Sequence, residues 1–144
     1  MIRTLTHLAV LVFTILVWGC SGGSGDRAES IKLKQYYIKG EQLYIAHCSN
    51  CHQKDGQGLG RVYPPIANSD FVRANPDTII CIIRSGLEGE VTVNGIMYNM
   101  AMPPIPTLTD LEIAQITTYI LNSWDYRKGL VDVKTTSARL ERCR

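Results

Sequence analysis

The stretch Cys48-Ser49-Asn50-Cys51-His52 is the most informative part of this chain of 144 residues. Two thiols lie three residues apart and a histidine follows the second, which is the attachment spacing of a c-type haem. On a helical turn both sulfurs can bond one porphyrin, and His52 can supply a nitrogen ligand to its iron. A thioredoxin-like redox pair would need a βαβ pattern, and a zinc knuckle would need two more ligands at short spacing. The motif therefore predicts one covalently bound haem c.

Length and charge narrow the class of protein further. A chain of this length is expected to form a single domain. Its formal net charge of +2 is too small to indicate a nucleic-acid-binding surface, so we expect no nucleic-acid partner. Glycine and proline are frequent, which argues against long sheets.

Residues 1–19 have the pattern of a signal peptide. Arg3 supplies a positive start, and the stretch from Leu8 to Trp18 is apolar except for Thr14. This stretch is short for a span of the bilayer and has the length of a signal-peptide core.

The end of this segment, Val17-Trp18-Gly19-Cys20, resembles the lipobox of bacterial lipoproteins, in which the cysteine is acylated and becomes the first residue. An ordinary secretory signal and an uncleaved membrane anchor are the alternatives. All three place the domain outside the cytoplasm, and acylation would anchor it to the periplasmic side of a bacterial membrane through Cys20. Residues 20–32 are then the lipidated cysteine and a flexible tether rich in glycine and serine.

Residues 33–126 are predicted to form the folded domain. A helical pattern runs from Leu33 to Asn50, and Gly40 and Tyr44 precede Cys48 by eight and four residues on the same face. A glycine inside a helix is plausible where another helix packs close, with a tolerated surface glycine as the alternative.

Further along, cap signals mark two more helices. Asn75 and Pro76 have the residue types of an N-cap and a first helical position, and Gly86 is a natural end. The β-branched residues between them would also allow a strand, but the cap signals favour a helix. Thr109 and Glu112 form a capping box for the last strong helix, whose expected apolar face includes Leu111, Ala114, Ile116, Tyr119, Ile120 and Trp124. Between the two, residues 91–98 around Asn94-Gly95 could form a small hairpin.

Gly40, Tyr44, Cys48, Cys51 and His52 together resemble the first helix of the small class I cytochromes c, and the likeness in motif order and spacing extends from about Leu33 to Trp124. It implies an all-α cytochrome c fold, with three to five helices wrapped around one covalently bound haem. It also implies that the N- and C-terminal helices cross, with Tyr119 and Ile120 against Gly40 and Tyr44.

The same resemblance implies the remaining site residues. A proline carbonyl orients the proximal histidine in this family, so Pro64 or Pro65 would accept a hydrogen bond from His52. Met97, Met100 and Met102 are candidates for the sixth iron ligand, because a thioether is a soft ligand of haem iron. The resemblance selects Met102, which directly precedes a proline in a Tyr-x-x-x-Met-Pro context. Met100, then Met97, are the alternatives, and all three could instead serve only in packing.

Two cysteines remain once haem attachment and acylation are assigned. In an oxidising compartment, Cys81 and Cys143 suggest a disulfide that ties the tail to the second helix, with Cys81 as an inert buried thiol the alternative. The tail, residues 127–144, is expected to carry a short helix from Thr135 to Arg144.

The resemblance implies an electron carrier rather than an enzyme. Expected partners are redox proteins such as a quinol-oxidising complex, a dehydrogenase, or a terminal oxidase or reductase. One alternative is a haem gas sensor or peroxidase-like enzyme with an open sixth position, for which Arg61 or Arg84 could supply a distal group. Another is a fixed electron-transfer subunit of a dehydrogenase or oxidase complex.

Overall fold

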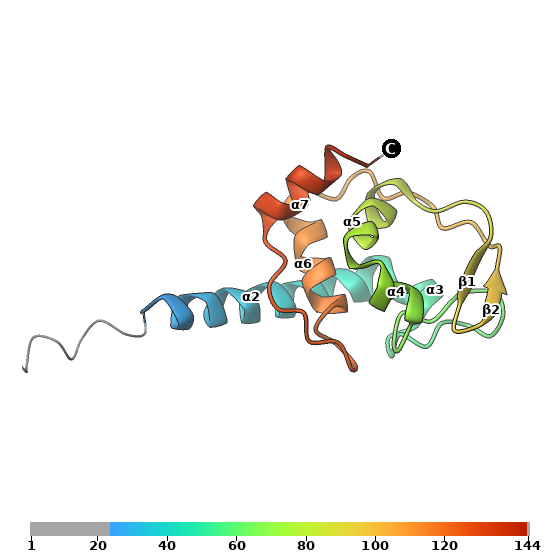
Figure 1. Ribbon diagram of the computed structural model, residues 1–144, viewed down its shortest axis with the longest axis horizontal. Helices are drawn as coiled ribbons and strands as arrows, with labels where there is room; N and C mark the ends of the chain where they lie inside the picture. The colour runs from blue at the N-terminus through green and yellow to red at the C-terminus, as the bar shows by residue number, and fades with distance from the viewer. Residues whose placement is uncertain (1–23, 144) are drawn as a thin grey trace, which may run out of the picture. The chain divides into compact units, whose positions relative to one another are not determined.

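The computed structural model describes residues 24–143 (Figure 1). Residues 31–143 belong to the compact unit that carries the candidate site, and residues 24–30 belong to a separate unit. The elements are α2 (Ser24–His47), α3 (Ser49–His52), α4 (Asp70–Ala74), α5 (Pro76–Ser85), β1 (Val91–Val93), β2 (Ile96–Tyr98), α6 (Asp110–Ile120) and α7 (Val133–Leu140). The predicted all-α fold is confirmed. Six helices are described rather than three to five, because α3 and α4 are separate short helices of four and five residues.

Helix α2 begins earlier than predicted. We expected a flexible tether through residue 32, but the helix already starts at Ser24. The tether prediction is therefore wrong from that residue on, because Asp26-Arg27-Ala28-Glu29 and the residues after it favour a helix and only the short run at 21–25 is rich in glycine and serine. Cys20 and the predicted signal peptide lie outside the described residues. Among residues 24–143, no helix has both the length and the hydropathy needed to cross a membrane.

The close crossing of α2 and α6 depends on Gly40. A side chain at this position would collide with the main chain of Gln115 and with Tyr119, so the missing Cβ allows the two helices to approach closely. Tyr119 also contacts Tyr37 and Tyr44, each at a ring-centroid distance of 5.2 Å. The predicted contact of Tyr119 is thus present, while Ile120 lines the cavity described below.

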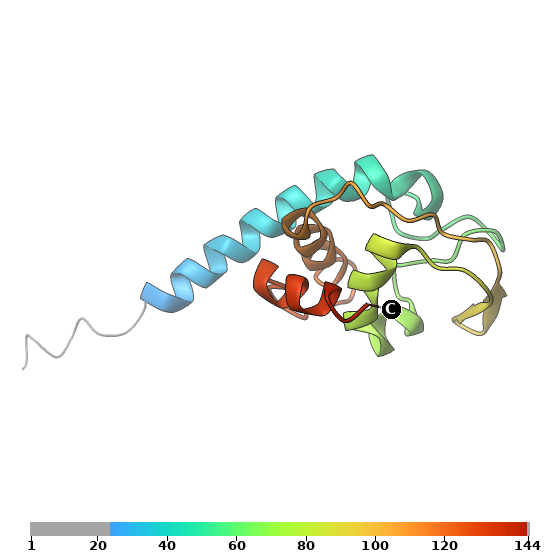
Figure 2. The same ribbon diagram turned by 90° about the horizontal axis from the view of Figure 1, so that it is seen from above.

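Helices α5, α6 and α7 pack against one another (Figure 2). This packing buries α6 on more than the one face that was expected: Ile113, Thr117 and Thr118 are buried as well, whereas Leu111 is 42% exposed. The capping box of α6 is present, with the Glu112 carboxylate accepting from the Thr109 amide at 2.8 Å.

The second helix, α5, has the predicted bounds, with Asn75 at the predicted N-cap position. The Asn75 side chain, however, makes no capping hydrogen bond to α5 and instead donates to the Phe71 carbonyl of α4 at 2.9 Å. The predicted hairpin is present, with strands β1 and β2 paired on either side of Asn94-Gly95 and both turn residues at positive φ. Its turn is fastened to α4, because the amides of Asp70 and Asn94 each donate to the other residue's side chain, at 3.0 and 2.7 Å.

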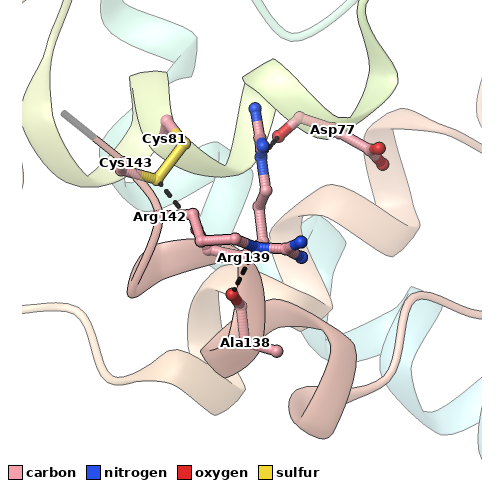
Figure 3. Close-up of a disulfide and its surroundings, with 6 residues drawn as sticks. All are labelled: Asp77, Cys81, Ala138, Arg139, Arg142 and Cys143. Atoms are coloured by element: carbon pink, nitrogen blue, oxygen red, sulfur yellow. Dashed lines mark hydrogen bonds between the residues drawn. A yellow bond between two sulfur atoms is a disulfide. The ribbon is translucent and has the colours of Figure 1, made fainter.

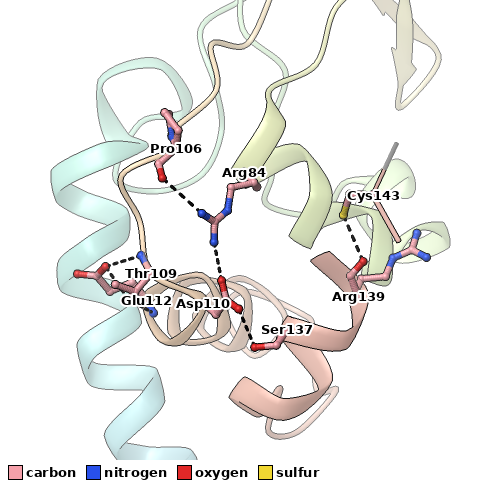
Figure 4. Close-up of polar contacts among 8 residues, drawn as sticks. All are labelled: Arg84, Pro106, Thr109, Asp110, Glu112, Ser137, Arg139 and Cys143. Atoms are coloured by element: carbon pink, nitrogen blue, oxygen red, sulfur yellow. Dashed lines mark hydrogen bonds and ion pairs between the residues drawn. The ribbon is translucent and has the colours of Figure 1, made fainter. Parts of the chain in front are cut away.

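The tail folds back on the domain through α7. A disulfide joins Cys81 of α5 to Cys143, with the two Cα atoms 5.5 Å apart (Figure 3). Asp110 of α6 links the same three helices, since it accepts from Arg84 of α5 at 2.6 Å and from Ser137 of α7 at 2.7 Å (Figure 4). The predicted short helix is present, but it runs from Val133 to Leu140 instead of from Thr135 to Arg144.

Candidate functional site

The attachment motif forms its own helical turn at the end of α2. The first helix was expected to continue to Asn50, but it ends at His47, and α3 follows with Cys48 as its N-cap. Cys48 is buried, Cys51 is half-buried, and neither forms a disulfide. Burial, and secondarily the neighbouring Cys51, raise the pKa of Cys48 to about 12. A thioredoxin-type pair needs a thiol of lowered pKa, so the redox-pair alternative does not fit this environment.

The orientation of His52 is determined by one hydrogen bond. Its Nδ1 lies 3.0 Å from the carbonyl oxygen of Pro64. Because a carbonyl only accepts, Nδ1 carries the proton and Nε2 keeps a free electron pair. Burial lowers the pKa of His52, although the bond to Pro64 opposes this shift, so the ring is neutral near pH 7. Of the two candidate prolines, the structure thus places Pro64 in this role, while Pro65 lines the cavity.

An apolar cavity opens in front of Cys48 and His52. Apolar walls with a few polar groups are typical of a cofactor site. The cavity is also lined by Pro64, Pro65, Ile66, Ser69, Phe71, Val72, Ile79, Ile82, Ile83, Leu87, Val91, Val93, Met102 and Ile120. Helix α5 supplies three of these isoleucines, Ile79, Ile82 and Ile83, and so forms one wall of the cavity.

A second apolar cavity lies beside the first and is lined by Cys51, Tyr98 and Met100 among others. His52 and Met102 line both cavities. The two cysteines, the histidine and the predicted methionine therefore border two adjacent apolar cavities that share His52 and Met102.

The three candidate methionines differ in their surroundings. Met97 and Met100 are 61% and 54% exposed, whereas Met102 is half-buried. The main chain of Met102 is paired with Leu87 through two hydrogen bonds, at 2.9 and 3.0 Å. Gly86 makes this pairing possible, because its φ is +75° and a Cβ there would collide with the Met102 carbonyl.

Sequence reasoning missed several residues that shape the site. Leu87 was not singled out, although it follows Gly86, and a glycine at the end of a helix can allow another main-chain segment to approach closely. Tyr126 is almost fully buried, and its hydroxyl accepts from the Ser69 amide at 2.7 Å and donates to the Ile66 carbonyl at 2.8 Å. A buried tyrosine at the end of a helical pattern gives no sequence signal for such a partner.

His47 is a second imidazole that the sequence interpretation overlooked. Its side chain is exposed and lines neither of the two cavities. Among residues 24–143, no three His, Cys, Asp or Glu side chains gather as they would at a zinc site. The donor set of two unpaired thiols, one neutral imidazole and one thioether around an apolar space fits haem c.

Comparison with known proteins agrees with this donor set. Residues 37–120, more than half of the chain, match the model of the family described as cytochrome c oxidase, cbb3-type, subunit III. The chain belongs to this family of c-type cytochromes. It is accordingly an electron-transfer protein with covalently bound haem c.

The cytochrome is also similar to characterised proteins of two kinds. Cytochrome c-552 of Thermus thermophilus is 31% identical over 103 residues, which are 69% of this chain and 78% of the relative. The fructose dehydrogenase cytochrome subunit of Gluconobacter japonicus is 33% identical over 96 residues, or 64% of this chain and 20% of that subunit. The alcohol dehydrogenase (quinone) cytochrome c subunit of Komagataeibacter europaeus is 32% identical over 90 residues, or 60% and 19%. The likeness to the dehydrogenase subunits thus covers one cytochrome-sized part of each.

Proposed function

We propose that this cytochrome carries a single haem and acts as a membrane-tethered one-electron carrier in a respiratory or dehydrogenase-linked chain. The observation that carries the proposal is the placement of His52 and Met102 on one apolar cavity beside Cys48 and Cys51. Cys48 and Cys51 would form the thioether bonds, and His52 Nε2 and the Met102 sulfur would be the axial ligands of the iron. One attachment motif in the sequence supports one haem.

When bound, haem c supplies a one-electron couple at its iron. Pro64 holds the His52 ring in the tautomer that leaves Nε2 free and raises the basicity of that ligand. The main-chain pairing of Met102 with Leu87 holds the methionine in place on the other side of the cavity. Ligation by methionine and histidine raises the reduction potential of the iron. The isoleucines of α5 exclude water, and burial of this kind is one of the levers by which a protein sets the potential.

A catalytic or sensing function is less well supported. Arg84 is engaged by Asp110 and by the Pro106 carbonyl, and Arg61 is exposed. Neither arginine lines the two cavities, so neither is positioned as a distal acid–base group. No enzyme activity is therefore proposed.

For partners, we infer redox proteins: a quinol-oxidising complex, a dehydrogenase, or a terminal oxidase or reductase. The dehydrogenase cytochrome subunits among the relatives support the second of these, and they favour a fixed subunit of such a complex as the second candidate function. A stable complex after purification would distinguish the fixed subunit from a mobile carrier.

We also propose an exported protein, with residues 1–19 as signal peptide and Cys20 as the lipid-anchored first residue on the periplasmic side of a bacterial membrane. The apolar stretch from Leu8 to Trp18 and the lipobox-like sequence before Cys20 support this location. Lipid attachment would raise the local concentration of the carrier near membrane-bound partners.

The absorption spectrum of the holoprotein tests the proposed ligation. We expect the weak near-infrared band of a thioether–iron(III) bond in the oxidised wild type and its loss in Met102→Ala. Met100→Ala is the matched control, because Met100 lies two residues away on the same segment but is exposed, and it should keep the band. A wild type without the band that binds carbon monoxide readily would instead indicate an open sixth position and contradict the carrier function.

A further inference from the structure

Helix α2 has apolar side chains on the face that points away from the core. Ile31, Ile38 and Ile45 are 51%, 47% and 43% exposed. They recur every seven residues, so they form one stripe along the helix. At 3.6 residues per turn this stripe lies about half a turn away from Gly40, which faces α6. Single exposed apolar residues are ordinary, but three in one line along the outer face of a helix indicate a contact surface.

The charged residues between Ile31 and Ile45 are mainly basic: Lys32, Lys34 and Lys39, with Glu41 as the single acidic residue, and all four are exposed. None of the three lysines forms an ion pair with another described residue. On the side toward α6 and α7, the carboxylates near the lysines are Glu112 and Asp132, and both are occupied in capping the start of a helix. Exposed isoleucines with lysines beside them suit contact with an anionic membrane surface, where apolar contact and electrostatic attraction act together.

The chain that precedes α2 indicates which surface is available to the stripe. Cys20, the proposed acylation site, is only four residues before Ser24, where α2 begins. An uncleaved apolar stretch ending at Trp18 would place membrane-embedded residues almost as close. Either form of attachment keeps the stripe near a bilayer, where a second weak signal adds to the first.

A second copy of the chain fits the stripe less well. Stable protein interfaces bury roughly 800 Å² on each partner. Three half-exposed isoleucines separated by Gln35 and Gln42 offer much less apolar area than that. A membrane surface needs no such area when the chain is already attached to it.

We propose that the outer face of α2, from Ile31 to Ile45, lies on the anionic membrane surface to which the N-terminus is attached; this rests on the proposed membrane tether. Because α2 runs directly into Cys48, the same contact orients the haem site relative to the membrane. The cytochrome then presents its haem to membrane-bound partners in one orientation, rather than moving freely on a flexible linker.

Lysine labelling of the full-length holoprotein on vesicles tests the proposal. The protein is added to preformed vesicles of phosphatidylcholine with phosphatidylglycerol, floated, and treated with a membrane-impermeant acetylating reagent; mass spectrometry then gives the rate at each lysine. We expect Lys32, Lys34 and Lys39 to react several-fold more slowly on vesicles than in solution. Lys54, Lys128 and Lys134 are the internal controls, since they are exposed and lie outside α2, and their rates should not change.

A variant with Ile31→Gln, Ile38→Gln and Ile45→Gln should still float but should lose the protection. These side chains are half-exposed, so the fold should persist, and an unchanged haem spectrum checks this. Leu111→Gln is the matched control, because Leu111 is similarly exposed on α6 and its substitution should leave the protection intact.

The other outcomes each overturn the proposal in a recognisable way. Flotation with equal labelling of all lysines would leave the tether standing and remove the contact of α2. Protection that persists in the triple variant would assign it to the tether alone. Slow labelling of the three α2 lysines relative to the control lysines in the absence of vesicles, together with a doubled mass, would identify a second copy on this face. Failure to float would overturn the tether itself, while the haem spectrum would still report on electron-carrier ligation.

Discussion

The two sides of the haem cavity are held by different kinds of structure. On the histidine side, the ligand belongs to a helical turn of five consecutive residues, and the His52 amide bonds to the Cys48 carbonyl within that turn at 3.0 Å. On the methionine side, Met102 belongs to no helix and is held by the main chain of Leu87, which follows α5. The first side therefore depends on contiguous sequence, and the second depends on how α5 and a distant segment come together. Substitutions on the two sides of the cavity should therefore have different effects on haem attachment and on the methionine ligand.

The largest effect is expected from the double substitution Cys48→Ser with Cys51→Ser. It removes both thioether positions, so no haem should remain bound after extraction with acidified acetone. Haem content per protein, from the pyridine haemochrome spectrum, measures this. Cys81→Ser with Cys143→Ser is the control, because that pair forms the disulfide and should leave covalent haem in place. Haem retained by the first variant would contradict the attachment role.

Gly86→Ala should act on the methionine side alone. The new Cβ would collide with the Met102 carbonyl, so the pairing with Leu87 should open while haem stays attached. We expect most of the near-infrared thioether band to disappear. Gly89→Ala is a close control, since Gly89 also has a positive φ, of +87°, but open space around its Cβ position. Equal loss of the band in both variants would point to general backbone strain instead.

The helix crossing behind the histidine side gives a smaller effect. Gly40→Ala places a methyl group against the Gln115 main chain, and overpacking of this kind costs about 1–3 kcal/mol of the free energy of unfolding. Gly25→Ala, in the same helix with nothing near its Cβ position, should be neutral or stabilising by up to about 1 kcal/mol. Denaturant unfolding of both holoproteins measures the difference. Equal stability of the two variants would show that α2 and α6 do not need this close approach.

The smallest effect is expected at the capping box of α6, which is formed by residues close together in the sequence. Hydrogen bonds from the Thr109 amide, and then from its hydroxyl, lower the pKa of Glu112. The carboxylate therefore stabilises α6 above the ordinary pKa of a glutamate, and this contribution is lost as the pH falls through the lowered value. Glu112→Gln should reduce the melting temperature slightly at pH 7, and the difference from wild type should shrink toward pH 3. A difference that does not change with pH would show that charge is not involved.

Several features of the fold could be predicted because their causes lie within a few residues. The capping box at Thr109, the Asn94-Gly95 turn and the span of α5 all depend on neighbours along the chain. The hydrogen bond of the Asn75 side chain could not be predicted in the same way. This side chain had two possible partners, and the position of α4 decided that it bonds to Phe71.

For the site, the sequence by itself determined the attachment motif and its histidine, because the chemistry requires two thiols and an imidazole at one local spacing. It also restricted the sixth ligand to three methionines, while the resemblance to the class I cytochromes c selected Met102 among them and restricted the partner of His52 to two prolines. The tertiary structure decided that Pro64 reaches Nδ1, that Met102 lies beside the cavity, and that Cys143 returns to Cys81. These choices depend on distances between atoms far apart in the chain, which packing of the helices determines and residue type does not.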